Sequence, residues 1–184
     1  MSRLPRTLAV LGAAAGLSVA AGGTLAHGAS HAKRYSAADK MSLQTSIMGD
    51  RFEIAGGKLA GQHGSTPAVK AYGARLVKDH SSSLKDAIAL AKKLGIKVPT
   101  APSPSQQWDL AILGGLTGQQ FDQQYADLEA KDHQQDISET TDEVKSGSNP
   151  QIVAAARKEL PTLRAHLAIA QQLGGKLGKD PGGG

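Results

Sequence analysis

Imidazole and carboxylate side chains recur on the apolar faces of the long helices that this sequence predicts. His80 lies in the middle of the apolar stripe of one helix, and Glu129 and His133 lie one helical turn apart on another. Glu53 and His166 hold similar places on two further helices. A titratable group on a face that becomes buried needs a partner, either a second polar side chain or a metal ion. Both residue types are common metal ligands in helical bundles.

Two interpretations of these five side chains follow from their chemistry. In the first, they hydrogen-bond one another across the bundle and set helix register without a metal. Glu53 would then pair with His80, and Glu129 with His133. In the second, the three imidazoles, including His166, hold a single transition metal ion together with one of the two carboxylates. Such a site suits Zn, Cu, Ni or Fe. The sequence favours the hydrogen-bonded network and keeps the metal site as the alternative.

Other chemistries have less support in the sequence. The chain has no cysteine, which excludes disulfides, thiolate metal sites and cysteine nucleophiles. The glycine pair at 56–57 lies inside a predicted helix, so it is not a phosphate-binding loop, and the serines at 81–83 point around a helix rather than toward one base. A glycosidase-like pair of Glu53 with Asp122 or Glu129 lacks the open cleft of such enzymes. We therefore assign no catalytic residue and favour a non-catalytic protein.

The composition favours an all-α fold. Of the 184 residues, 40% are hydrophobic but only 3% are aromatic, so leucine, isoleucine, valine and alanine must form the core. No convincing run of alternating apolar and polar residues predicts a strand. The length suits one domain.

The charge pattern does not indicate nucleic-acid binding. The formal net charge is +5, from 21 basic and 16 acidic residues. Removal of an N-terminal segment with Arg3 and Arg6 leaves 21 − 2 = 19 basic residues, a surplus of 19 − 16 = 3. Basic and acidic residues alternate along the helices, which is typical of a solvated surface. We expect no nucleic-acid partner. The sequence is compatible with a homo-oligomer formed through helix faces.

Residues 1–32 are typical of a secretory signal peptide. Two arginines form a positively charged start, and an apolar, alanine-rich run follows at 8–21. This run is short for a membrane span, although an uncleaved anchor is the alternative. Cleavage is expected after Ala26 or Ala32. We therefore predict a periplasmic or secreted protein with no stable membrane span after processing.

The first two long helices are predicted at residues 36–61 and 68–95. Ser36 is a suitable N-cap, and Asp39 completes a variant of the capping box. Gly95 ends the second helix. The turn between the two helices is short, so they should be antiparallel neighbours.

Glycines surround Glu53 in the first helix. Gly56 and Gly57 lie on the same side as this carboxylate, although each glycine costs about 1 kcal/mol of helix stability relative to alanine. They predict either a close approach of another helix or free space beside the carboxylate.

Residues 96–117 predict a crossover that spans the bundle and carries a short helix at about 105–113. Three prolines prevent a helix before this segment. We expect Trp108, Leu110 and Leu113 to fold back on the bundle, with Trp108 as a hydrophobic plug.

The last two long helices are predicted at about 117–146 and 150–174. Asn149 is the expected cap of the final helix, and Pro161 lies inside it. The glycine-rich tail at 175–184 is expected to be disordered. If the crossover makes the second and third long helices parallel, His80 and His133 lie at a similar level.

Three segments carry a resemblance to a known family: VKDHS, FDQQYADLEAKDH and LPTLRAH. Together they resemble the DUF4142 family, whose members are exported bacterial proteins placed among ferritin-like four-helix bundles. The resemblance covers about residues 36–171. It implies a ferritin-like four-helix bundle at 33–174 and export, but no reaction, because the family has no established activity.

The resemblance also provides a test for a di-iron centre. Ferritin-like di-iron sites use a Glu-x-x-His motif on each of two helices. Here Glu129 and His133 are four residues apart, and Glu159 and His166 are seven apart. His80 has no glutamate three residues before it. We therefore do not predict a di-iron carboxylate centre. The predicted function is a non-catalytic binding or stress-related role in the cell envelope, and the alternative is a metal-binding protein with or without redox activity.

Overall fold

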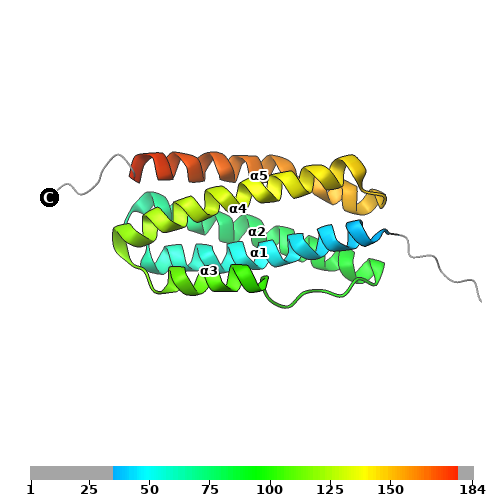
Figure 1. The fold of residues 1–184 in the computed structure, drawn as a ribbon, viewed down its shortest axis with the longest axis horizontal. Coiled ribbons are helices and arrows are strands. Elements are labelled where there is room, and N and C mark those ends of the chain that lie inside the picture. Colours follow the sequence, from blue (N-terminus) through cyan, green and yellow to red (C-terminus); the bar gives the residue numbers. More distant parts are fainter. Residues whose placement is uncertain (1–34, 178–184) are drawn as a thin grey trace, which may run out of the picture. The chain divides into compact units, whose positions relative to one another are not determined.

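The computed structural model describes residues 35–177, and this range contains five α-helices and no named strand (Figure 1). Within the same range, an isolated bridge-type pairing joins Gly64 and Gly118. The helices are α1 (Ala37–His63), α2 (Pro67–Leu94), α3 (Pro104–Gly114), α4 (Gly118–Ser146) and α5 (Pro150–Leu177). The predicted all-α fold class is therefore confirmed.

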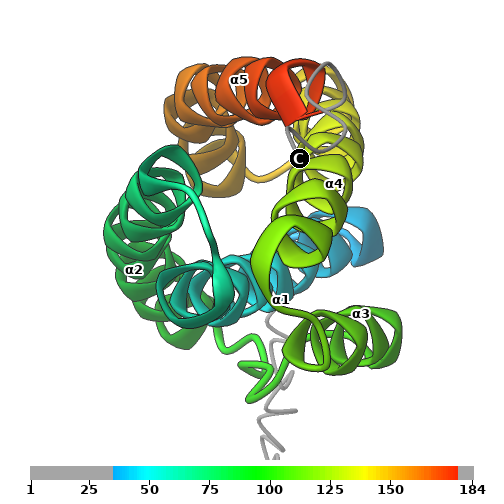
Figure 2. The same ribbon diagram turned by 90° about the vertical axis from the view of Figure 1, so that its left-hand side faces the viewer.

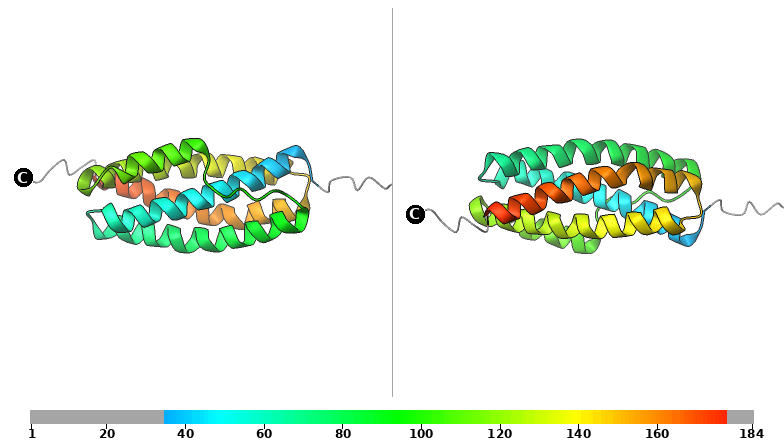
Figure 3. Two further views of the ribbon diagram at one scale, coloured as in Figure 1. Left: turned by 90° about the horizontal axis from the view of Figure 1, so that it is seen from below. Right: turned by 90° about the horizontal axis from the view of Figure 1, so that it is seen from above.

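Helices α1, α2, α4 and α5 form a four-helix bundle, and α3 lies outside it against α1 and α4 (Figure 2). Both α1 and α5 pack on α2 and α4, so α2 and α4 face each other across the diagonal of the bundle. The connection from α2 to α4 runs back along the bundle and contains α3 (Figure 3). Because Asp122 near the start of α4 accepts a hydrogen bond from the Thr66 amide before α2, the two helices begin at the same end and run parallel.

Most of the predicted helix ends coincide with observed caps. Ser36 and Asp39 form the predicted capping box at the start of α1. Thr66 caps α2, which ends at Gly95 with a left-handed φ of 68°. Asn149 accepts hydrogen bonds from the first amides of α5. These local signals are strong because the terminal amides of a helix have no partner within the helix.

The last helix is longer than predicted. It continues through Pro161 to Leu177, three residues beyond the expected end at Gly174. Leu177 is partly buried and packs against the apolar cluster that includes Tyr125. This contact explains why the helix extends into the glycine-rich sequence. The remainder of the predicted tail, at 178–184, lies outside the described residues.

Two buried aspartates close the ends of the bundle. Asp39 accepts hydrogen bonds from the Ser148 and Asn149 amides in the α4–α5 turn. Burial opposes the ionisation of Asp39, but hydrogen bonds from Ser148 and Ser36 outweigh it and hold the pKa below its ordinary value. At the other end, Asp122 accepts hydrogen bonds from the Ser65 amide and hydroxyl, at 2.8 and 2.7 Å. These bonds fix the relative height of the helices.

A glycine contact brings α1 and α2 close together. A methyl group added at Gly57 would lie 2.5 Å from the Gly73 carbonyl oxygen, well inside contact distance. The close helix approach that the glycine pair predicts is therefore present at Gly57.

The apolar core is divided into two clusters. One contains Tyr72, Leu76 and Tyr125, and the other contains Leu43 and Ile152. On α1, α2 and α5, the predicted polar residues Glu53, His80 and His166 fall between members of the two clusters, and on α4 His133 follows the members of the first cluster. The bundle therefore has a polar layer between two apolar ones.

The prediction that Trp108 is a hydrophobic plug of the bundle is wrong. Its exposed fraction is 71%, whereas Leu113 of the same helix is fully buried and Leu110 is partly buried. Leu110 and Leu113 are three residues apart and share a helix face, but Trp108 lies about 160° from Leu110 around the helix axis. Once the leucines pack inward, the indole must point outward.

The predicted signal peptide and its cleavage positions at Ala26 and Ala32 lie outside the described residues. In the range 35–177, no helix is long and apolar enough to cross a membrane.

Candidate metal centre

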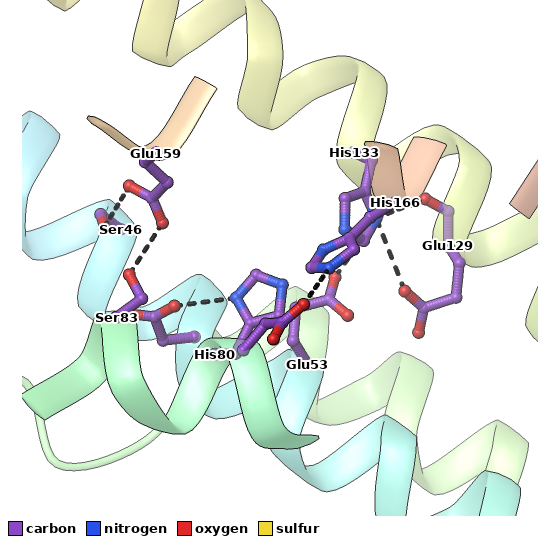
Figure 4. A network of polar contacts seen from close by, with 10 residues as sticks. Ser46, Glu53, His80, Ser83, Glu129, His133, Glu159 and His166 are labelled. Carbon is purple, nitrogen blue, oxygen red and sulfur yellow. Dashed lines mark hydrogen bonds and ion pairs between the residues drawn. The ribbon is translucent and has the colours of Figure 1, made fainter. Parts of the chain in front are cut away.

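All five residues singled out from the sequence lie inside the bundle. Each is at most 3% exposed: Glu53 from α1, His80 from α2, Glu129 and His133 from α4, and His166 from α5. Figure 4 shows the side chains converging from four different helices. The expectation that carboxylates and imidazoles share one buried interior is therefore met.

The three imidazoles form a compact group. The ring centroids of His80 and His133 are 5.9 Å apart, those of His80 and His166 are 5.2 Å apart, and those of His133 and His166 are 5.3 Å apart. One ring nitrogen from each residue lies within 4.8 Å of the other two. Because α2 and α4 are parallel, residues distant in the sequence reach the same level of the bundle.

Each imidazole is anchored through one nitrogen. His80 Nδ1 lies 2.8 Å from Asp50 Oδ1, and His166 Nε2 lies 3.0 Å from Asp79 Oδ2. His133 Nδ1 lies 2.9 Å from the backbone carbonyl oxygen of Glu129. A carbonyl oxygen only accepts, so His133 must donate from Nδ1 and keep its lone pair on Nε2. The expected bond from Glu53 to His80 is replaced by the bond from Asp50.

The other nitrogen of each ring has no hydrogen-bond partner among the described residues. These atoms are His80 Nε2, His133 Nε2 and His166 Nδ1, and all three are shielded from solvent. Burial lowers the pKa of all three imidazoles, to about 3 for His133. At neutral pH the rings are therefore uncharged, which is the form that binds metals. Anchoring one nitrogen to a carboxylate or carbonyl is also the usual arrangement behind a metal-bound histidine.

The two glutamates form a separate pair beside His133. Glu53 Oε1 and Glu129 Oε2 lie 3.7 and 3.6 Å from Nδ1 of His133, on the anchored side of the ring. Burial raises the pKa of Glu129 to about 8. Burial, followed by the charge of Glu129, raises the pKa of Glu53 well above its ordinary value. A methyl group at Gly56 would lie 3.3 Å from Glu129 Oε1, so this glycine leaves room for the carboxylate.

The predicted ligands therefore do not meet at one point. The three imidazoles lie together and each has one unpaired nitrogen, while Glu53 and Glu129 group with the anchored side of His133. The imidazole group alone supplies the donor set of a mononuclear transition-metal site with an open position. The carboxylates, which hold protons near neutral pH, are suited to a supporting role.

Sequence reasoning overlooked the side chains that anchor the imidazoles. Asp50 precedes Glu53 by three residues and shares its helix face, which is a usable signal. Asp79 directly precedes His80 in the sequence, but its side chain turns toward α5 and contacts His166. Ser83 donates a hydrogen bond to Glu159 at 2.9 Å, so this hydroxyl has a specific partner (Figure 4). These pairings join different helices and become visible only when the bundle is assembled.

The fold and the polar layer define a helical-bundle protein with a buried imidazole–carboxylate cluster. A family model described as "Domain of unknown function (DUF4142)" matches residues 24–173, and the chain belongs to this family. Searches of curated proteins and of solved structures found no match to the chain.

Proposed function

We propose that this protein binds a single transition metal ion through His80, His133 and His166, and acts as a metal-binding protein of the cell envelope. Two observations carry the proposal. Each of the three buried rings has one nitrogen with no hydrogen-bond partner among the described residues, and one nitrogen from each ring lies within 4.8 Å of the other two. A purely structural network would be expected to pair most of these atoms, because an unpaired buried polar atom costs about 1–3 kcal/mol. A metal ion satisfies all three at once.

The geometry is compatible with metal binding after small adjustments. Three nitrogens at about 2.0–2.1 Å from a tetrahedral zinc ion lie roughly 3.3 Å from one another. One nitrogen of each ring is now within 4.8 Å of the other two, so binding requires the rings to approach one another by about 1.5 Å at most. Zn, Cu, Ni and Fe all accept imidazole ligands, so the donor set defines a class of metals rather than one ion.

Elemental analysis of protein purified without chelator tests the proposal. We expect close to one transition metal ion per chain, and we expect His133→Ala to abolish stoichiometric loading. His63→Ala is the matched control, because His63 contacts the Leu116 carbonyl near the end of α1 and is not part of the cluster. Wild-type protein that stays metal-free after incubation with Zn, Cu, Ni and Fe salts, with no change in melting temperature, would refute the metal site.

A second candidate is the non-catalytic bundle whose polar interior is structural. Specific contacts favour it, since Asp50 joins His80 across α1 and α2, and Asp79 joins His166 across α2 and α5. In this case, binding or stress-related activity would reside elsewhere on the protein. This candidate is selected if the wild-type protein is metal-free and if His80→Ala and His166→Ala each lower the stability of the protein.

Export to the periplasm or the medium is the second part of the proposal. It rests on the charged start, the apolar run and the small residues of positions 1–32. Mass spectrometry of the mature protein tests it. We expect a new N-terminus at His27 or Lys33. Full-length protein recovered only from the cytoplasm would contradict export.

A further inference from the structure

A chamber of about 750 Å³ opens beside the imidazole cluster. Its walls come from the first half of α1, the middle of α2, the second half of α4 and the first half of α5. His80 and Asp50 stand at the end nearest the metal centre, and Leu43 and Ile152 belong to its apolar wall. The volume falls within the range typical of sites for small organic ligands.

The chamber exists because small side chains occupy positions where a bundle normally places large ones. Ser46, Ser83, Ala87 and Ala156 all line it. Protein interiors are otherwise packed to crystal-like density, and unfilled space lowers stability. A space of this size that has polar and apolar walls is therefore suited to a ligand that is itself part polar and part apolar.

The polar wall is rich in carboxyl groups. Asp50, Asp136 and Glu159 bring carboxyl groups to it from three different helices. The lining also includes two permanent cations, but both already have acidic partners. Arg75 lies 3.4 Å from Asp79, and Lys158 lies 2.8 Å from Asp86.

One of these carboxyl groups has an atom available for a ligand. Asp50 is 2% exposed, and its Oδ1 is occupied by His80. Its Oδ2 has no hydrogen-bond partner among the described residues. Glu159 is positioned by Ser83 and Ser46, whose hydroxyls lie 2.9 and 3.5 Å from its oxygens (Figure 4). A buried, unpaired carboxylate oxygen next to an oriented one is an arrangement that receives hydrogen-bond donors.

We propose that this chamber binds a small aliphatic amine, with the ammonium group on Asp50, Asp136 and Glu159 and the alkyl chain against Leu43 and Ile152. An ammonium group offers three hydrogen-bond donors and a positive charge. The carboxyl oxygens of the polar wall accept hydrogen bonds, so they suit such a group. An inorganic cation would leave the apolar wall without a partner, and a carboxylate ligand would bring no hydrogen-bond donor to these acceptors. This site adjoins the proposed metal site through His80 and Asp50, but it does not require a bound metal.

Isothermal titration with n-hexylamine at neutral pH, where it is a cation, tests the proposal on chelator-treated and on zinc-treated protein. Three further probes serve for comparison. 1-Hexanol lacks the charge, hexanoate carries the opposite charge, and ammonium chloride lacks the alkyl chain. We expect saturable binding of n-hexylamine that is at least about tenfold tighter than that of each of these probes, since charge-assisted hydrogen bonds are the strong ones.

Variants identify the site. Asp136→Asn and Glu159→Gln should each weaken n-hexylamine binding by about tenfold while the melting curve stays cooperative. Asp127→Asn is the matched control for Asp136→Asn, because Asp127 is an exposed α4 residue that does not line the chamber. Binding that is unaffected by both chamber variants would overturn the proposal.

The probes separate the remaining outcomes. Equal affinity for 1-hexanol would identify a merely apolar cavity, equal affinity for ammonium chloride would identify a simple cation site, and no saturable binding at millimolar concentrations would identify a water-filled space. Each of these results would also overturn the proposal. Because the chelator-treated protein is tested separately, a failure of the metal site does not affect the result.

Discussion

The Asp79 carboxylate holds the buried His166 ring from the edge of the bundle, with Oδ2 3.0 Å from Nε2. The same oxygen also lies 3.4 Å from Nε of Arg75. Burial opposes the ionisation of Asp79, but His166 and Arg75 outweigh it and hold the pKa of this carboxyl below its ordinary value. An ionised Asp79 accepts from Nε2 and therefore leaves the lone pair of Nδ1 for a ligand.

Replacing this anchor should weaken the metal site without unfolding the protein. We expect Asp79→Asn to lower metal affinity by about 10–100-fold, because an amide is a weaker acceptor and no longer favours the required tautomer. Competition with a fluorescent chelator measures this change. Asp86→Asn, an exposed position seven residues along α2, is the control and should bind metal like the wild type. Equal affinities for both variants would contradict the anchoring role.

The pH dependence of stability should report the buried carboxyl groups. Burial raises the pKa of Glu129 from 4.5 to about 8 and that of Asp50 from 3.8 to about 8. Between the ordinary pKa values near 4 and the raised values near 8, the folded state holds protons that the unfolded chain has lost. The free energy of unfolding therefore falls as pH rises. His133, with a pKa of about 3, acts in the opposite direction, but only below the unfolded histidine value of about 6.5.

Urea unfolding of chelator-treated protein checks this expectation. The free energy of unfolding should decrease between about pH 7.5 and about pH 8.5, where the unfolded histidines have lost most of their protons and the buried carboxyl groups of the folded state still release theirs. Glu129→Gln should make the decrease shallower, because its side chain no longer titrates. A free energy that rises over this interval would show that these groups are ionised in the folded protein.

The glycines of α1 should differ sharply in their tolerance of alanine. Gly57→Ala places a methyl group 2.5 Å from the Gly73 carbonyl oxygen and should destabilise the protein by about 1–3 kcal/mol. Gly61→Ala meets nothing within 4 Å and should stabilise the helix by up to about 1 kcal/mol. Thermal or urea denaturation of the two variants measures both changes. A stabilising Gly57→Ala would mean that α1 and α2 are farther apart than described.

Trp108 should behave as a surface residue. It is the one tryptophan in the chain and is 71% exposed, so its fluorescence in the folded protein should already resemble that of indole in water. Iodide or acrylamide should quench it almost as well before unfolding as after. We expect Trp108→Ala to change the free energy of unfolding by no more than about 0.5 kcal/mol. A strongly blue-shifted, protected emission would indicate that the indole is covered.

Local rules were enough to predict the helices of this protein. The capping box at Ser36, the N-cap Thr66 with Pro67 at the first position of α2, and the left-handed Gly95 all act within a few residues, so their effect can be read from the sequence. Periodicity also placed His80 and His133 on inward faces. It could not choose an orientation for Trp108, because a short helix outside a bundle can expose an aromatic residue at small cost.

The sequence by itself determined that charged and imidazole side chains must enter the interior, because they lie on helix faces that have no alternative to burial. Only the tertiary structure decided which of them meet. Asp50 reaches His80, Asp79 reaches His166, and Glu53 approaches His133. The physical reason is that these pairings depend on the relative height and rotation of separate helices, and a shift of one residue along a helix turns a side chain by about 100°.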